Sequence, residues 1–121
     1  MYGDTQEDLF VNAAVGLANV MRSDADKLVK RSRGHKKIKV EAQDQSSLLV
    51  DFLNEILSES NIEGKIFPRV KILRISSKLV EAQIFGVGVD GFEEDVKAVS
   101  YHNVEIEKKG DKLQATLVLD I

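Results

Sequence analysis

The stretch Val96–Ile121, VKAVSYHNVEIEKKGDKLQATLVLDI, decides the fold predicted for this chain. Its first half, Val96–Ile106, is rich in β-branched and aromatic residues, and a polar turn with a glycine follows at Lys108–Asp111. In Leu113–Ile121 the apolar residues alternate with polar ones, as in a strand with one face buried. The stretch therefore predicts a β-hairpin whose second strand is the C-terminus.

A chain that ends on a core strand has a fixed α-carboxylate, whereas most termini fray. Asp120 lies beside the terminal carboxylate of Ile121, so the sheet would hold two carboxylate groups on adjacent residues. Carboxylate oxygens are ligands for hard divalent cations. The residues alone favour a cation site here only weakly, because an acidic residue near a C-terminus commonly serves solubility.

The composition bounds the class of protein. The 121 residues carry a net charge of −3, contain no cysteine, and suit one domain, predicted over residues 1–121. No overall positive charge is available to hold nucleic acid, and neither disulfides nor thiolate metal sites can form. No apolar run approaches the length of a membrane span, and the N-terminus lacks a signal-peptide pattern. A soluble, cytoplasmic protein with no membrane contact is expected.

Two helices are predicted. The first follows Thr5, a residue that can cap a helix, and the second follows Asp44–Ser47. Apolar residues at helical spacing give each helix one buried stripe. On the second helix Asp51 borders that stripe, and a lone carboxylate there is more often exposed than functional.

The remaining strands are expected at Lys36–Ala42, Ile66–Ile75 and Leu79–Val89, with the last two forming a hairpin around Ser76–Lys78. Pro68 favours an edge position or a late start for its strand. Gly86 and Gly88 flank Val87 and suggest a bulge or bend at the end of the other strand. Two amphipathic helices covering a mainly antiparallel sheet make an α+β two-layer sandwich.

No catalytic arrangement is visible in the sequence. Neither histidine has the spacing of a catalytic or zinc-binding pair, and no nucleophile lies beside a base. His102 on a strand is more often a hydrogen-bonded structural residue than a ligand, and Lys97 is either a surface lysine or a counter-charge to carboxylates. The basic segment Lys27–Lys37 is either a solvated surface or a patch for RNA phosphate or an acidic partner.

Four segments of this chain resemble the archease family and occur in the same order as in that family. They are KAVSYHNVEI, the terminal LVLDI, LLVDFLNEIL at Leu48–Leu57 and YGDTQEDLFVNAAVGLANVM at Tyr2–Met21. Archeases are small α+β proteins that activate the GTP-dependent RNA ligase of tRNA splicing. They promote guanylylation of its active-site histidine and sustain turnover, so the resemblance implies a non-enzymatic activator. The RNA would be contacted through the ligase or the Lys27–Lys37 patch.

The resemblance also implies a calcium site formed by the last two residues, Asp120 and Ile121, and an aspartate from the family's first strand. Asp51 and Lys97 match acidic and basic positions around that site, and His102 matches the family's tyrosine–histidine pair. The family's first strand is not found in this sequence, so we expect a gap in the sheet and weakened calcium affinity. Two alternatives remain open, a chaperone-like protein-interaction module that uses the gap as a groove and an RNA-binding domain without a ligase-specific role.

Overall fold

The larger sheet of this protein has three strands in the order β2-β4-β3, formed by Arg33–Glu41, Leu79–Gly88 and Lys65–Ile75. The computed structural model describes residues 2–101 and 106–121. Both strand pairs are antiparallel, and β3 with β4 forms the predicted hairpin. Because β3 lies at an edge, the loss of one backbone donor at Pro68 is tolerated, and the register between β3 and β4 shifts around this proline.

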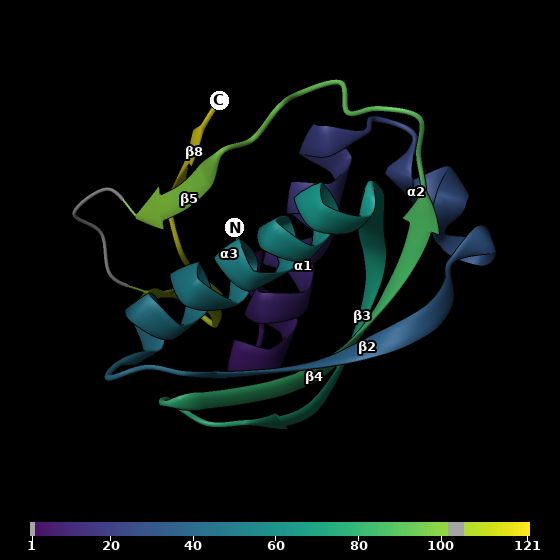
Figure 1. The fold of residues 1–121 in the computed structure, drawn as a ribbon. Coiled ribbons are helices and arrows are strands. Elements are labelled where there is room, and N and C mark those ends of the chain that lie inside the picture. Colours follow the sequence, from purple (N-terminus) through teal and green to yellow (C-terminus); the bar gives the residue numbers. More distant parts are fainter. Residues whose placement is uncertain (1, 102–105) are drawn as a thin grey trace.

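Two long helices, α1 (Gln6–Met21) and α3 (Gln45–Glu63), pack against one face of this sheet (Figure 1). Their aromatic side chains meet in the core, where the ring centroids of Phe10 and Phe52 are 5.6 Å apart. Val80, Ala82 and Ile84 of β4 alternate along the covered face and are fully buried. The apolar stripes predicted from the sequence are therefore the contact surfaces of the two helices.

The predicted helix starts are confirmed by hydrogen bonds at both N-termini. The Thr5 hydroxyl accepts from the backbone N–H of Asp8 at 3.1 Å, and the Asp44 carboxylate accepts from that of Ser47 at 2.7 Å. At the other end of α3 the chain turns at Gly64, whose φ of 64° is left-handed and suits glycine.

The basic segment after α1 is more ordered than predicted. It forms a short helix α2 (Ala25–Leu28) and a 3₁₀ turn η1 (Val29–Arg31), and β2 then begins at Arg33, three residues before the strand expected from Lys36. Ala25 is fully buried, so the segment is anchored to the core.

A bulge or bend was expected at the end of β4, where Gly86 and Gly88 flank Val87, but the irregularities lie in the neighbouring strands. β4 continues through Gly86 to Gly88. The register shifts lie between Arg33 and His35 of β2 and, in β3, between Ile66 and Arg69 and between Ile72 and Arg74. A Cβ at Gly86 would lie 2.7 Å from the ring of Phe67, so glycine provides room for that ring.

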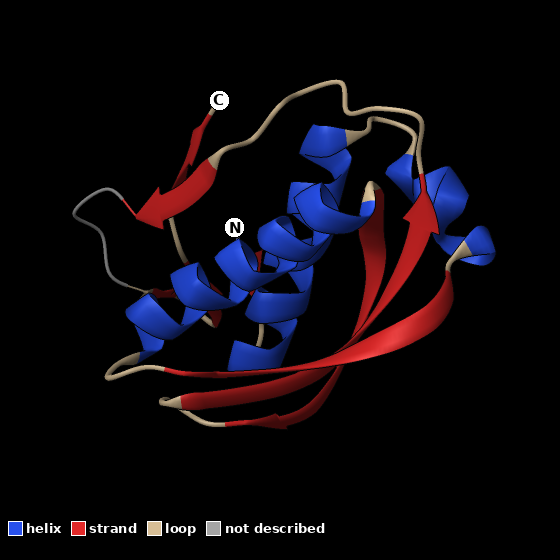
Figure 2. Cartoon of the chain, in the orientation of Figure 1, coloured by secondary structure: helices blue, strands red, loops and turns tan. Residues whose placement is uncertain are grey.

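The C-terminal hairpin is divided into shorter strands (Figure 2). β5 (Ala98–Tyr101) pairs with β8 (Leu117–Asp120), whereas β6 (Glu107–Lys109) and β7 (Lys112–Gln114) form a tight hairpin. That hairpin joins β1 (Tyr2–Gly3) in a sheet of order β1-β7-β6. A continuous strand was expected after the turn, but strand structure is interrupted at Ala115–Thr116, and residues 102–105 of the strand expected before the turn lie outside the described part of the chain. The segment Tyr2–Gly3, expected to lead into a helix, is itself paired.

The predicted α+β class with a mainly antiparallel sheet is confirmed, since every strand pair among the described residues is antiparallel. The strands form two small sheets in addition to the larger one. Among residues 2–101 and 106–121, no helix combines the length and apolarity needed to cross a membrane.

Candidate functional site

The last strand is held by hydrogen bonds as far as the penultimate residue. In the antiparallel pair of β5 and β8, Ala98 lies opposite Asp120. The backbone N–H of Lys97 donates to the carbonyl oxygen of Asp120 at 2.6 Å, which extends the pairing by one more bond. Ile121 follows with 60% of its surface exposed. The backbone at Asp120 is thus fixed while the side chains at the end of the chain face solvent.

Helix α3 holds this strand pair through one side chain, Asn54. Its amide nitrogen donates to the carbonyl oxygen of Val99 at 2.8 Å, and its amide oxygen accepts from the Val99 N–H at 2.8 Å. The backbone N–H and C=O groups of Val99 in β5 are therefore both hydrogen-bonded to α3. Sequence reasoning missed Asn54, although an asparagine among the apolar residues of a core-facing helix was a signal.

Lys97 lies beside the C-terminal half of α3. A shallow hollow of about 330 Å³ separates them, lined by Asn54, Leu57, Ser58, Asn61, Ile62 and Lys97. Since Val99 lies at Asn54 and Lys97 lies near Ser58, β5 runs in the direction opposite to α3. The structure thus brings together Lys97 and the Asp120 backbone, two of the predicted positions.

Asp51 is an exposed residue on α3, placed further toward the N-terminus of the helix. The Ser46 hydroxyl accepts from the backbone N–H of Ile106 at 3.0 Å, so Asp51 lies between this contact and Asn54 along α3. It precedes Ser58 by seven residues, about 10 Å along a helix axis. His102 lies outside the described residues.

The donor set expected for calcium is incomplete in the described part of the chain. Asp120 and the terminal carboxylate of Ile121 offer two carboxylate groups, whereas calcium takes about six to eight oxygens. Residues 2–101 and 106–121 contain no group of three or more His, Cys, Asp or Glu side chains placed to hold a metal. These two residues alone do not make a closed calcium site.

Arg22, at the end of α1, fixes the segment that leads into β5. Its guanidinium contacts Asp24 at 3.1 Å and Asp90 at 3.0 Å, and it also donates to the carbonyl oxygen of Gly91. The hydrogen bond from Arg22 lowers the pKa of Asp24, and the two carboxylates raise the pKa of Arg22. Glu93 adds a backbone bond, donated by its N–H to the carbonyl oxygen of Met21 at 2.8 Å. The acidic loop is therefore an ordered connection, which sequence reasoning did not foresee.

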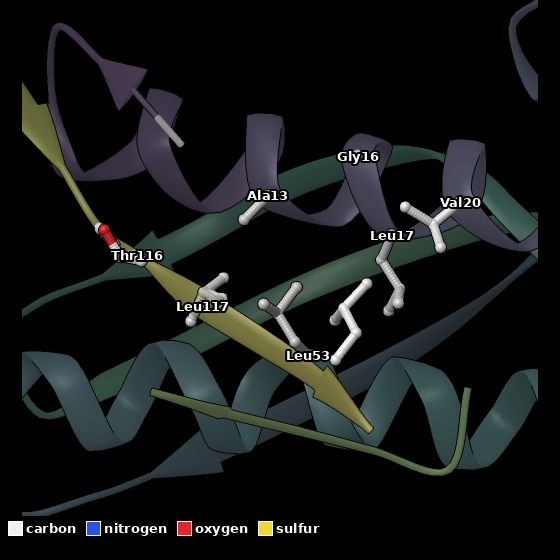
Figure 3. Close-up of a pocket in the computed structure, with 9 residues that line it drawn as sticks. Ala13, Gly16, Leu17, Val20, Leu53, Thr116 and Leu117 are labelled. Carbon is white, nitrogen blue, oxygen red and sulfur yellow. The ribbon is translucent and has the colours of Figure 1, made fainter. Parts of the chain in front are cut away.

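An apolar groove of about 400 Å³ lies between α1, α3 and the last strand (Figure 3). Its lining consists of Ala13, Gly16, Leu17, Val20, Leu53, Ala115, Thr116, Leu117 and Leu119. On one side is α1 with its small residues, and on the other is the stretch from Ala115 into β8. Among the described strands, β8 pairs only with β5.

The register of β1 gives the groove a direction. Tyr2 lies opposite Gln114 and Gly3 lies opposite Leu113 in an antiparallel pair. β1 therefore runs antiparallel to β7, just before the stretch from Ala115 that lines the groove. The carbonyl oxygen of Tyr2 accepts from the Asn12 amide at 2.9 Å, which holds β1 against α1.

The Lys27–Lys37 patch is divided by the fold. Its first residues lie on α2 and η1, and its last lie on β2. Lys36 Nζ forms an ion pair with Glu59 Oε1 of α3 at 2.7 Å, and this contact raises the pKa of Lys36. The Glu59 side chain is only 10% exposed, so Lys36 serves the packing of α3 on the sheet. One cation of the patch, Lys36, is therefore neutralised within the fold.

The sequence model of the Archease protein family (MTH1598/TM1083) matches residues 1–121, the whole chain. The chain belongs to the archease family. This membership confirms the resemblance seen in the tail and in the two helices.

Archeases from other organisms match almost all of this chain. The archease of Pyrococcus abyssi is 35% identical and that of Methanosarcina barkeri 33% identical, each over 128 residues. These alignments cover 99% of this chain and 88% and 86% of the respective archeases.

Two solved structures are similar in fold. The solution structure of Methanobacterium thermoautotrophicum protein 1598 is 29% identical, with a TM-score of 0.71, over 99% of this chain and 88% of that one. The crystal structure of an archease from Thermotoga maritima, described as a possible chaperone, is 20% identical, with a TM-score of 0.56. The alignment covers 100% of this chain and 87% of the Thermotoga maritima chain. At this identity the second likeness shows the archease fold alone.

Proposed function

We propose that this protein is a non-enzymatic activator of the GTP-dependent RNA ligase of tRNA splicing. It would promote guanylylation of the ligase's active-site histidine and thereby sustain multiple turnover. The observation that carries the proposal is membership of the archease family over the whole chain. The fixed backbone of the last strand supports it, because an activator that presents its C-terminus to a partner needs that end held in place.

The test is a reconstituted ligation reaction with purified ligase, GTP and an RNA carrying a 3′-phosphate and a 5′-hydroxyl end. With excess RNA, the protein should raise the number of ligations per ligase above one and increase covalent guanylate on the ligase. The variant Asp120→Asn, which removes one carboxylate at the terminal strand, should reduce this stimulation. The matched control Asp111→Asn, in the exposed turn after β6, should not. A ligase whose turnover is unchanged by the intact protein would refute the proposal.

The cation site belongs to this proposal. Asp120 and the Ile121 carboxylate would be the ligands, with the Lys97 ammonium balancing their charge, and Asp51 and His102 would support the site. Because the donor set is small, binding would be weak and completed by water or by the partner protein. A bound divalent cation would supply positive charge close to an incoming nucleotide.

A second candidate function is a protein-interaction module, and the apolar groove favours it. Its occupant would be an extended segment of a partner protein with an apolar side chain at every second residue. Such a segment would pair with the edge of β8 that has no partner strand among residues 2–101 and 106–121, and insert side chains between α1 and α3. Pairing of this kind uses backbone groups, so the occupant is a strand and not a small molecule.

This candidate is tested with a synthetic peptide of alternating leucine and threonine. Val20 borders the groove and is 37% exposed, whereas Ile62 is 75% exposed and lies elsewhere on α3. Val20→Glu should abolish peptide binding, and Ile62→Glu should leave it intact. Equal binding by both variants would remove the groove as a docking site.

A further inference from the structure

Positive charge is concentrated on the larger sheet although the chain as a whole is acidic. The strands β2, β3 and β4 together hold eight of the 17 Lys and Arg residues but only two of the 20 Asp and Glu residues. The rest of the chain consequently carries nine basic and eighteen acidic residues. A chain with a net charge of −3 thus contains a sheet with an excess of six positive charges. Such separation creates a local field that can hold an anion.

One face of this sheet is open. Figure 1 shows α1 and α3 on the other face, and no described element covers the outer one. Along β4, Glu81, Gln83 and Phe85 point outward and are only half-buried, whereas the residues between them are fully buried. On β2 their neighbours Lys37 and Lys39 are exposed, and on β3 so are Arg69, Lys71 and Arg74.

Cations lie in register across this outer face. Lys37 of β2 and Lys71 of β3 both face Gln83, so they flank β4 on either side. Two neighbouring strand spacings separate such residues by about 10 Å. Within the described part of the chain, neither lysine forms an ion pair. Two other cations of the face are paired, Arg74 with Glu81 and Lys39 with Glu41, each at 3.4 Å and exposed to solvent.

The same face carries an aromatic residue beneath a guanidinium. Arg69 and Phe85 are opposite each other, and the guanidinium carbon lies 4.0 Å from the centre of the ring. A stacked Arg–Phe pair presents a flat cationic surface, on which a nucleobase can stack. Beside it is a hollow of about 280 Å³ lined by Lys37, Ile38, Lys39, Leu73 and Glu81.

We infer that the outer face of the β2-β4-β3 sheet binds single-stranded nucleic acid. One base stacks on the Arg69–Phe85 pair, and the phosphates on either side contact Lys37 and Lys71. Single strands fit this surface better than duplexes, because their bases are free to leave the stack and lie on a sheet. An acidic protein surface would use the lysines but would have no need of the aromatic stack. The inference does not depend on ligase activation and concerns the protein alone.

The test measures fluorescence anisotropy of a labelled oligouridylate of about twelve nucleotides, a length that spans one binding face. The protein should bind it, and the logarithm of affinity should fall with the logarithm of salt concentration with a slope of about −1.4, as for the two phosphate contacts of Lys37 and Lys71. A duplex of the same length should bind at least about fivefold more weakly.

Three variants separate this site from nonspecific attraction. The double variant Lys37→Glu, Lys71→Glu should weaken binding at least about tenfold. Lys108→Glu, Lys109→Glu makes the same change of charge on exposed β6 and should leave affinity within about twofold. Phe85→Leu keeps an apolar side chain but removes the ring, and should weaken binding about fivefold or more. Circular dichroism and melting curves verify the fold of each variant.

Three results would overturn the inference. The first is no measurable oligouridylate binding at low salt. The second is an equal loss in the two lysine double variants. The third is unchanged affinity in a folded Phe85→Leu variant together with equally tight binding of a polyglutamate peptide, which would make the face a generic anionic-protein surface. None of these results involves the ligase, so each is separable from failure of the proposed activator function.

Discussion

The side-chain amide of Asn54 is bonded twice to one residue, accepting from the Val99 N–H and donating to the Val99 carbonyl oxygen, both at 2.8 Å. This pair joins the middle of α3 to the strand that holds the C-terminus. Among the described strands, β5 pairs only with β8. On the other side of β5, the Asn54 amide makes the two backbone hydrogen bonds that a second neighbouring strand would make. The position of the terminal residues therefore depends on a helix side chain as well as on strand pairing.

Asn54→Ala should destabilise the protein, because it removes two hydrogen bonds and leaves both backbone groups of Val99 without a partner. Unsatisfied groups of this kind cost about 1–3 kcal/mol in the free energy of unfolding. Urea denaturation measures the loss, and hydrogen exchange should show faster exchange of the Val99 amide. Asn61→Ala, an exposed asparagine of the same helix, is the control and should change stability by less than about 0.5 kcal/mol. A wild-type exchange rate at Val99 in Asn54→Ala would contradict this role.

Gly86→Ala should destabilise the protein, whereas the control Gly88→Ala should not. A Cβ at Gly86 would lie 2.7 Å from the Phe67 ring, whereas a Cβ at Gly88 meets nothing within 4 Å. Phe67 is 4% exposed, so its ring has little space to withdraw and overpacking of about 1–3 kcal/mol is expected. Thermal melting compares the two variants. If the clash is the cause, Phe67→Leu should cost less in the Gly86→Ala background than in the wild type.

The sequence predicted those parts of the fold in which one local pattern decides the structure. The β3–β4 hairpin and the capped starts of α1 and α3 follow from alternation and from the hydrogen-bonding side chains Thr5 and Asp44. The division of the C-terminal hairpin could not be predicted, because it depends on β1 pairing with β7 from the opposite end of the chain.

The candidate site was predictable only in part, for a similar reason. Strand alternation indicated that Asp120 would be held by the sheet, and the backbone bond to Lys97 confirms that its main chain is fixed. Asn54 was missed because a polar residue on a helix usually faces solvent, and its partner is 45 residues away. The basic outer face was missed because its cations come from strands that are separate in the sequence and adjacent only in the fold.

Stability should fall in acid partly through Asp44. The Ser47 backbone hydrogen bond lowers the pKa of this carboxyl from the value of 3.8 that it has when unperturbed. A group whose pKa is lowered on folding adds stability above its unfolded pKa, and this contribution disappears as pH falls through the folded pKa. Asp44→Asn keeps a side chain able to cap α3 but has no charge to lose. Its melting temperature should be below that of the wild type at neutral pH and equal to it well below pH 3.8.

Asp44→Ala provides the control, because it removes the cap itself and should lower the melting temperature at every pH. A difference between wild type and Asp44→Asn that persists unchanged in strong acid would show that the charge of Asp44 is not the cause.

Calcium should bind weakly to this protein. Asp120 and the terminal carboxylate provide fewer oxygens than calcium requires, and affinity decreases with the number of charged ligands. We expect a Kd of about 10⁻⁴–10⁻³ M or weaker in a calorimetric titration, and further weakening in Asp120→Asn. Lys97→Met should instead tighten binding slightly, since it removes a positive charge near the site. Asp111→Asn makes the same chemical change as Asp120→Asn in an exposed turn and should leave the titration unchanged. Sub-micromolar calcium binding would mean that ligands other than these two complete the site, and Asp51→Asn would then test whether that carboxylate is one of them.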